Sequence, residues 1–463
     1  MTNYWTSLFR ATVLGVLVMG NTLSAADWKV GLARRDITPT ESIYLAGHVN
    51  NTRFSEKALH PIWIKAAAFE DARGRRAVIV TADIFGMQRP KTDEVWDAIE
   101  KKIGLGRDRV AINFSHCHAL PLLAGTLPPA YRVLVETSER WDVIHRYTKR
   151  VQDGMVAAVV EAVGNLRPAV IDYGEDACDI RDKDKDIKPY TGEIDRDRSF
   201  HDRVPVLRVK DAKGALIAIL FGYPTHAQSA GNIIHGGYMG FAMLELEKKY
   251  SGAQAMFLLG TGALTTIRGF NHPVFSPEAS EETGALLSEA AVRALEKPME
   301  PIRGGTIACA VAEVELPFAS PLAKEQLLAR RRESARSDYL MRRDEFLIAY
   351  EEKHGKPLGS YKAIEQVFRI GDDLTFIFLS GETAEGYGYR LSELEYPDRR
   401  VWVTGFNNDQ FAYVPTEGVL NGPLCRVGGA SQTYWGWPSK WAKGIEDRIV
   451  GTVKGLVAKV DGP

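Results

Sequence analysis

The fold is decided by the stretch RVAINFSHCHALP at residues 109–121, where an apolar strand pattern runs directly into a pair of histidines. Most of residues 109–114 are apolar, which is typical of a central strand buried on both faces. His116 and His118 follow at once. Side chains at positions i and i+2 of an extended segment point to the same side, so we expect both imidazoles in one cleft at the carboxyl end of this strand.

The rest of the chain repeats the same alternation of apolar strands and helices. Further strand patterns occur at residues 77–82, 216–221, 255–259 and 374–379. Helical patterns occur between them at residues 92–103, 147–163 and 279–295. This order predicts an α/β fold, a layered mixed β-sheet flanked by helices with its site at the strand ends. Residues 322–354 predict a pair of amphipathic helices, and residues 179–203 a long charged surface loop.

Composition and charge narrow the class of partner. The chain has 463 residues, 45% of them hydrophobic, and 58 Lys and Arg balance 59 Asp and Glu. This is ordinary globular composition without the basic surplus that nucleic-acid binding requires. After the first 26 residues we find no apolar run of about 18 residues, the length that a membrane helix needs. We therefore expect neither nucleic acid as the partner nor a membrane-spanning helix after residue 26.

The first 26 residues predict export. Arg10 precedes a short apolar run at residues 11–20, and small residues at 24–26 suit cleavage before Asp27, so the protein is expected to be secreted or periplasmic. The alternative is an uncleaved membrane anchor. Four cysteines would permit up to two disulfides in an exported protein, and their wide separation argues against a cysteine zinc site. A chain with this much core does not need disulfides, so we expect buried free thiols; the four are Cys117, Cys178, Cys309 and Cys425.

Two strand ends carry histidines. His116 and His118 follow one strand, and His226 in GYPTH follows the strand at residues 216–221. An HxH pair offers two imidazoles to a metal, although two hydrogen-bonded loop histidines would show the same pattern. Since open α/β sheets collect ligands along one edge, His226 strengthens the metal interpretation. Glu382, after the strand at residues 374–379, offers a carboxylate at a third strand end, or simply a partner for a helix dipole.

Two hydroxyl groups occupy comparable positions. Tyr413 follows the strand-like run at residues 401–405, where an aromatic residue usually serves packing. Thr265 lies in a Gly-rich turn after the strand at residues 255–259, where a hydroxyl can face the same cleft or cap the next helix.

Motifs along most of the chain share their order and spacing with one family. They are VGL (30–32), DITP (36–39), VTAD (80–83), SHCHALP (115–121), PTH (224–226), IHGGYMGFA (234–242), GETAEGYGYRL (381–391) and FAYVPT (411–416). They resemble the neutral, non-lysosomal ceramidases, zinc-dependent amidases that hydrolyse the N-acyl bond of ceramide. In that family the corresponding segments include THTHSGP, a VHPTS-like segment and GEF…G-RL.

The resemblance implies a role for each matching residue. According to this resemblance, the Zn²⁺ ligands are His116, His226, Glu382 and Tyr413. Two further assignments follow from it: His118 would bind substrate or transfer a proton beside a metal-activated water, and Arg181 matches the family's head-group arginine.

The chain departs from the family where the substrate would bind. Residues 262–267 read GALTTI where the family has a GDVSPN-like turn, so Thr265 replaces a serine and the acidic neighbour is lost. Residues 426–431 read RVGGAS for RYEGAS, so Val427 replaces a tyrosine. Only 25 residues follow QTYWGWP, too few for the family's immunoglobulin-like C-terminal domain of about 100. We therefore expect a signal at residues 1–26 and one catalytic domain at 27–463.

The favoured function is an exported, zinc-dependent hydrolase that cleaves an N-acyl amide, ceramidase-like, in lipid or sphingolipid metabolism. A second candidate is a deacylase, amidase or esterase for a polar N-acyl sugar or peptide. Three aromatic residues could stack on a sugar, although they could equally pack in the core: Tyr434, Trp435 and Trp437. A third is a non-catalytic envelope binding protein that keeps the metal for structure.

Overall fold

The computed structural model describes residues 28–47, 53–126, 138–182, 202–268, 272–273, 275–332, 338–421 and 435–462. The expected signal segment at residues 1–26 lies outside the described residues, as do Cys425, Val427, Tyr434 and most of the expected loop at residues 179–203.

The larger sheet is mixed and contains nine strands among the described residues. They are β1 (Trp28–Asp36), β3 (Trp63–Asp71), β4 (Arg76–Ala82), β5 (Val110–Phe114), β6 (Arg167–Ala177), β7 (Arg203–Asp211), β8 (Leu216–Tyr223), β10 (Gln254–Leu259) and β11 (Glu300–Pro301). Eight of them run in the order β10-β8-β7-β6-β1-β3-β4-β5, and β11 pairs with β6. The pairs β4–β5 and β8–β10 are parallel, and the other neighbours are antiparallel. The strand predicted at residues 109–114 is confirmed as β5, but its expected central position is wrong, because it stands at one end of this order.

A second sheet lies against the first. It has the order β12-β13-β14-β16, built from β12 (Ile307–Pro317), β13 (Ser360–Ile370), β14 (Leu374–Phe378) and β16 (Arg400–Thr404). The strand expected at residues 374–379 therefore exists but belongs to this second sheet. Two short parallel pairs complete the strands: β2 (Lys57–Ala58) with β9 (Ile233–Ile234), and β15 (Glu382–Thr383) with β17 (Tyr413–Val414).

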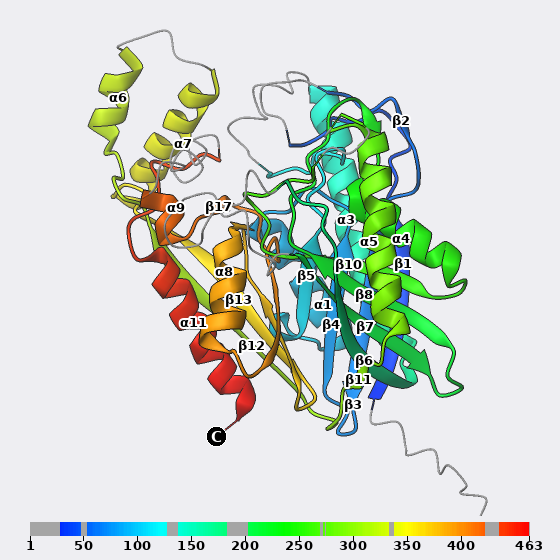
Figure 1. Cartoon of the computed structure of the whole chain (residues 1–463). Coiled ribbons are helices and arrows are strands. Elements are labelled where there is room, and N and C mark those ends of the chain that lie inside the picture. The colour runs from blue at the N-terminus through cyan, green and yellow to red at the C-terminus, as the bar shows by residue number, and fades with distance from the viewer. Residues whose placement is uncertain are drawn as a thin grey trace, which may run out of the picture.

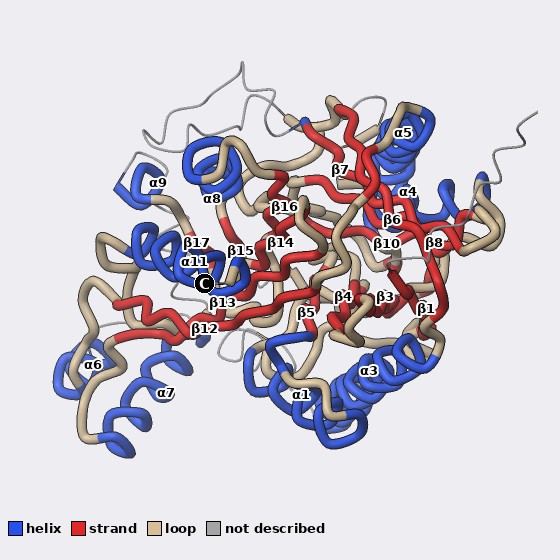
Figure 2. Tube along the Cα trace, turned by 90° about the horizontal axis from the view of Figure 1, so that it is seen from below, coloured by secondary structure: helices blue, strands red, loops and turns tan. Residues whose placement is uncertain are grey.

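Helices cover the outer faces of both sheets, which gives four layers in the order α/β/β/α (Figures 1 and 2). The larger sheet is covered by α1 (Arg89–Ile103), α3 (Ser138–Gly164), α4 (Gly237–Lys249) and α5 (Pro277–Glu296). The second sheet is covered by α11 (Ile445–Asp461). The remaining helical elements are η1 (Arg107–Arg109), α6 (Lys324–Arg332), α7 (Asp338–His354), α8 (Glu385–Tyr389), the π-helix η4 (Arg390–Glu395) and α9 (Glu417–Asn421). The expected helix pair at residues 322–354 corresponds to α6 and α7. No helix in the described part of the chain is long and apolar enough to cross a membrane.

The apolar strands are buried on both faces. In β4, Val78 and Val80 point into the core beneath the helices, whereas Ala77 and Ile79 point into a second core between the two sheets. Successive side chains of a strand face opposite sides, so a strand between two cores needs apolar residues at every position. This explains why the sequence shows continuous apolar runs instead of an apolar–polar alternation.

Asn113 draws the two ends of the larger sheet together. Its Oδ1 accepts the Leu259 N–H at 2.8 Å and its Nδ2 donates to the Leu259 carbonyl at 3.2 Å, so β5 and β10 are linked although they stand at opposite ends of the strand order. The same amide group donates to Gly405 and Asn407, which follow β16 of the second sheet. Because β8 is the neighbour of β10 and β14 is the neighbour of β16, the segments that follow β5, β8 and β14 meet in one place.

Candidate metal centre

Three buried histidines converge where those segments meet. His116 and His118 follow β5, His226 follows β8, and one ring nitrogen from each lies within 4.8 Å of the others. His118 Nε2 and His226 Nε2 are 2.8 Å apart. The prediction from sequence that two strand ends contribute histidines to one place is confirmed for these three side chains.

Backbone carbonyls fix the tautomers of two of the rings. His116 Nδ1 lies 2.5 Å from the carbonyl oxygen of Phe85, and His226 Nδ1 lies 3.2 Å from that of Ala263. A carbonyl oxygen can only accept, so each Nδ1 carries the hydrogen and each Nε2 of a neutral ring presents a lone pair. Histidines that bind metals usually hold their second ring nitrogen in this way. His116 and His226 therefore each keep an unprotonated Nε2 within the cluster.

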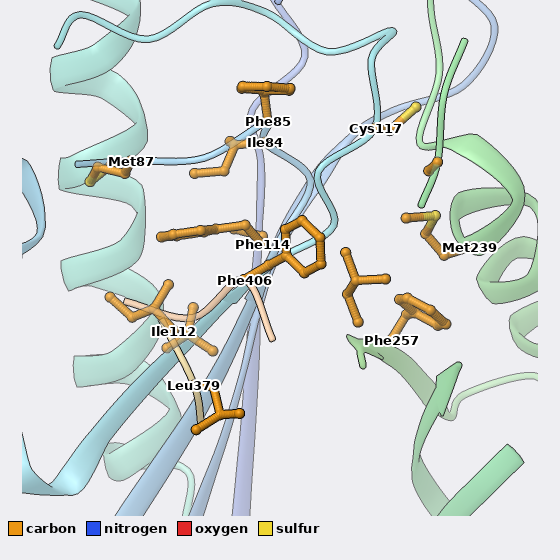
Figure 3. Packing of buried hydrophobic residues seen from close by; sticks show 14 of the residues in the cluster. Ile84, Phe85, Met87, Ile112, Phe114, Cys117, Met239, Phe257, Leu379 and Phe406 are labelled. Carbon is orange, nitrogen blue, oxygen red and sulfur yellow. The ribbon is translucent and has the colours of Figure 1, made fainter. Parts of the chain in front are cut away.

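The backbone at His116 is not extended. Its φ is 53°, in the left-handed region that few non-glycine residues adopt, so the expected i, i+2 geometry of an extended segment is wrong here. The imidazole is held by aromatic contacts instead, with ring centroids 4.0 Å from Phe85 and 4.7 Å from Phe406. Figure 3 shows both phenylalanines in the same buried cluster, on separate segments of the chain. The rings of His116 and His118 nevertheless lie close together, with their centroids 5.5 Å apart.

Glu382 and Tyr413 reach the same place from the short strand pair β15–β17, whose strands follow β14 and β16 of the second sheet in the chain. They are directly paired across the short parallel strands β15 and β17. Glu382 Oε2 lies 3.6 Å from His116 Nε2. Burial opposes ionisation of the Glu382 carboxyl, but His116, His226 and a hydrogen bond from Tyr413 together lower its pKa below the ordinary value. Glu382 is therefore a carboxylate at neutral pH.

The arrangement fits a metal ion. Among the described residues, His116 Nε2 and Glu382 Oε2 are buried without a hydrogen-bond partner. Orphaned buried groups are costly unless something else satisfies them, and a cation between an imidazole lone pair and a carboxylate would do so. Imidazole nitrogens with carboxylate or phenolate oxygens suit Zn²⁺ and other divalent ions of the first transition row. His118 stands within the same cluster, close enough to act as a ligand or to exchange a proton.

The turn at residues 263–266 lies beside His226. Thr265 is buried, its Oγ1 donates to the Pro224 carbonyl at 3.1 Å, and its own carbonyl accepts the His226 N–H at 3.2 Å. Arg181 contacts the end of this turn through a β-bridge with Ile267. Its guanidinium is fully buried and binds Asp202 through Nε and Nη2 at 3.2 and 3.0 Å. The roles that the resemblance implies for Thr265 and Arg181 stay predictions.

Cys117 does not join its histidine neighbours. Its Sγ lies 3.5 Å from the carbonyl oxygen of His235, and burial raises the pKa of the thiol to about 12, so it stays protonated. Within the described part of the chain Cys117, Cys178 and Cys309 are free thiols.

Trp437 serves packing. Its Nε1 donates to the Phe411 carbonyl at 2.8 Å and its ring lies 5.0 Å from that of Tyr361. Trp435 is also buried. Neither indole is placed to stack on a sugar at the surface, so this pair does not support a sugar substrate.

Asp409 was not singled out from the sequence, yet it supports the strand end that carries Glu382. The Asp409 carbonyl accepts the Gly381 N–H at 2.8 Å. Its carboxyl is fully buried and accepts the Tyr361 hydroxyl at 2.7 Å and the Arg89 N–H at 2.9 Å. Burial raises the pKa of Asp409 to about 7, despite these hydrogen bonds. Only the tertiary structure reveals it, because FNNDQ has no strand or helix period.

This raised pKa predicts a pH-dependent stability. Between an unfolded pKa near 4 and a folded pKa near 7 the folded state holds the Asp409 proton more tightly, so its contribution is complete at low pH and is lost as the pH rises through 7. We expect Asp409→Asn, which keeps the shape and can still accept the Arg89 N–H, to flatten the fall in unfolding free energy by up to about 1.4 kcal/mol per pH unit. Urea unfolding of the metal-free protein from pH 4.5 to 6.5 measures this. Parallel slopes for both proteins would contradict it.

Comparison with known proteins identifies the family. The profile of the family described as "Neutral/alkaline non-lysosomal ceramidase, N-terminal" matches residues 28–278, more than half of the chain. The chain belongs to this family. The protein is therefore a ceramidase-like hydrolase. The matched range contains all three clustered histidines, Arg181 and Thr265, and the resemblance read from the motifs is confirmed.

Solved structures extend the likeness over most of the chain. Neutral ceramidase from Pseudomonas aeruginosa superposes with a TM-score of 0.67 at 18% identity, covering 94% of this chain and 75% of that one. A structure described as a ceramidase complexed with C2 gives a TM-score of 0.64 at 18% identity, covering 93% and 76%. At this identity they show the fold, including the part that carries Glu382 and Tyr413. No curated protein sequence matches the chain.

Proposed function

We propose that the protein is a Zn²⁺-dependent hydrolase that cleaves the N-acyl amide bond of a ceramide-like lipid. The observation that supports the proposal is that His116 Nε2 and Glu382 Oε2 are buried and lie 3.6 Å apart, beside His226. Both imidazoles are held through Nδ1 by backbone carbonyl groups. His116, His226, Glu382 and Tyr413 would hold the ion. The lipid class comes from the family to which the chain belongs.

The chain's own residues account for the remaining chemistry. Zn²⁺ in this position supplies a Lewis acid for the amide carbonyl and lowers the pKa of a water toward 7. His118, whose Nε2 lies 2.8 Å from His226 Nε2, would carry a proton to the leaving amine nitrogen. The C–N bond breaks, the carbonyl carbon gains the water oxygen, and the products are a fatty acid and a free amine. The Thr265 hydroxyl, in a turn that contacts His226, would bind the substrate amide, and Arg181 would bind its polar head.

Two other functions use the same residues differently. A deacylase or esterase for a polar N-acyl sugar or peptide would need polar or aromatic surface contacts. Because Trp437 is buried, it does not provide such a stacking surface. A binding protein would retain the metal without turnover.

A substrate panel decides among the three. Purified full-length protein loaded with Zn²⁺ is incubated with a short-chain ceramide, an N-acyl amino sugar and an N-acyl dipeptide, and the released fatty acid is measured by mass spectrometry. We expect the ceramide to be cleaved with a kcat/KM at least about tenfold higher than the others, a difference of about 1.4 kcal/mol in transition-state binding. Preference for the sugar or peptide would support the deacylase, and retained zinc without release would support the binding protein.

Export belongs to the same proposal. The apolar run at residues 11–20 after Arg10 supports a cleaved secretory signal, with residues 27–463 acting as one catalytic domain. N-terminal sequencing of protein recovered from the periplasm or medium tests it, and a chain that still begins at Met1 would reject cleavage.

A further inference from the structure

A buried carboxylate outside the proposed ligand set holds the turn at residues 263–266. Glu385, the first residue of α8, is 2% exposed. Its Oε1 accepts the N–H groups of Leu264 at 2.8 Å and Thr265 at 2.7 Å. The segment GALTTI at residues 262–267 contains no acidic residue, so the carboxylate at this turn comes from another element.

The turn connects two of the proposed ligands. On one side, its Ala263 and Thr265 carbonyls hold the ring and the backbone of His226, both at 3.2 Å. On the other side, the Ala263 N–H donates at 3.3 Å to the carbonyl of Thr383, the residue after Glu382. Three successive N–H groups of the turn, at residues 263–265, therefore bond to the segment 383–385. The geometry fixes the distance between His226 and Glu382 through this turn.

We propose that Glu385 is a positioning residue: through the turn at residues 263–266 it fixes His226 against Glu382 and so sets the affinity of the metal centre. This rests on the proposed metal site and adds a residue to it. Without an acceptor at this position the buried Thr265 N–H and the part-buried Leu264 N–H would be unpaired, which is energetically costly. The turn would then move to satisfy them, and the His226 ring would move with it. Residues that orient metal ligands in this way are typically worth 10–100-fold in affinity.

The proposed role of Glu385 depends on its oxygen as a hydrogen-bond acceptor more than on its negative charge. Burial raises the pKa of Glu385 to about 7, so the group takes up a proton near neutrality while the turn still requires its oxygen. A glutamine presents an amide oxygen of the same reach and carries no charge. Glu385→Gln should therefore preserve the turn, whereas Glu385→Ala removes the acceptor and Glu385→Asp places it one methylene too short.

The test is a Zn²⁺ titration of the full-length protein in competition with a chromophoric chelator. We expect Glu385→Ala to weaken Zn²⁺ binding by about 10–100-fold, Glu385→Asp by at least about threefold, and Glu385→Gln by less than about threefold. If Glu385→Ala does not fold, the Asp and Gln variants still make the comparison. Equal affinity of Glu385→Ala or Glu385→Asp and the wild type would overturn the proposal, as would a loss in Glu385→Gln as large as in Glu385→Asp.

Glu446 provides the matched control. It is 1% exposed, and its carboxyl accepts a backbone N–H, that of Glu417, at 2.8 Å together with the Arg390 guanidinium. Glu446→Ala should lower the unfolding free energy yet leave Zn²⁺ affinity unchanged, because Glu446 lies in the first turn of α11 and its carboxyl bonds to Glu417 and Arg390 instead of the turn at residues 263–266. If Glu446→Ala weakened Zn²⁺ binding as much as Glu385→Ala, the effect would be general destabilisation. A wild type that binds no Zn²⁺ would instead reject the metal site of the proposed function.

Discussion

His116→Asn is expected to abolish stoichiometric Zn²⁺ binding and to lower kcat/KM by about a thousandfold. That factor corresponds to the loss of about 4 kcal/mol of transition-state stabilisation by the metal. Asparagine is chosen because it tolerates the φ of 53° at this position, and its amide N–H can still donate to the Phe85 carbonyl as Nδ1 does. The substitution removes Nε2 and little else. Metal content by mass spectrometry and initial rates on the cleaved panel substrate measure the two effects.

The control is His145→Asn. His145 lies on α3 and is exposed, whereas the three clustered histidines are buried. Its variant should keep wild-type metal content and rate, and both variants should show the circular dichroism of the wild type. A His116→Asn protein that retains both zinc and activity would remove His116 from the ligand set and the metal mechanism with it.

The sequence predicted which strand ends carry the clustered histidines, because each of these strands is a short apolar run followed directly by a histidine-containing segment. β5 and β8 are short apolar runs followed at once by His116 and by PTH ending at His226. The bounds of these strands agree with the apolar runs to within about two residues. That agreement follows from burial on both faces, which requires an apolar residue at every position.

The reason why these strand ends meet could not be predicted. β5 and β10 stand at opposite ends of the larger sheet and are joined through the side chain of Asn113, which reads in the sequence as one polar residue within a strand. Likewise, Glu382 and Tyr413 lie 31 residues apart in the chain and become neighbours through two strands of two residues each. Strands this short leave no period. The strand-end position offered Glu382 as a candidate ligand, but only the family resemblance indicated that Tyr413 joins it and the histidines.

Glu385 was missed for a related reason. An acidic residue at the start of a helix is usually a partner for the helix dipole, and the sequence gives no sign that its side chain turns toward residues 263–265. The same limit applies to His116, whose left-handed backbone depends on contacts with Phe85 and Phe406. Local patterns predict elements, whereas the side chains that position ligands are selected by tertiary packing.

Gly262→Ala is the second change for which we expect a large effect. An added Cβ at Gly262 would lie 2.5 Å from the Pro224 carbonyl carbon and 2.5 Å from the Thr225 nitrogen, both backbone atoms of the segment that leads to His226. Backbone cannot rotate away as a flexible side chain can, so the turn and the His226 segment must separate. We expect the unfolding free energy to fall by about 1–3 kcal/mol. We expect kcat/KM to fall by about a hundredfold, because a ligand displaced by about 1 Å no longer meets the metal geometry.

Gly455→Ala separates this steric effect from the general effect of adding a methyl group. Gly455 is exposed on α11, and an added Cβ would meet nothing within 4 Å. Alanine in a helix is favoured over glycine, so this variant should gain about 0.5–1 kcal/mol and keep full activity. Thermal unfolding, zinc content and initial rates are compared for the two variants. If Gly262→Ala matched Gly455→Ala in rate and zinc content, the close packing of the turn on the His226 segment would not be what holds the metal centre, and the argument for Glu385 would lose its structural basis.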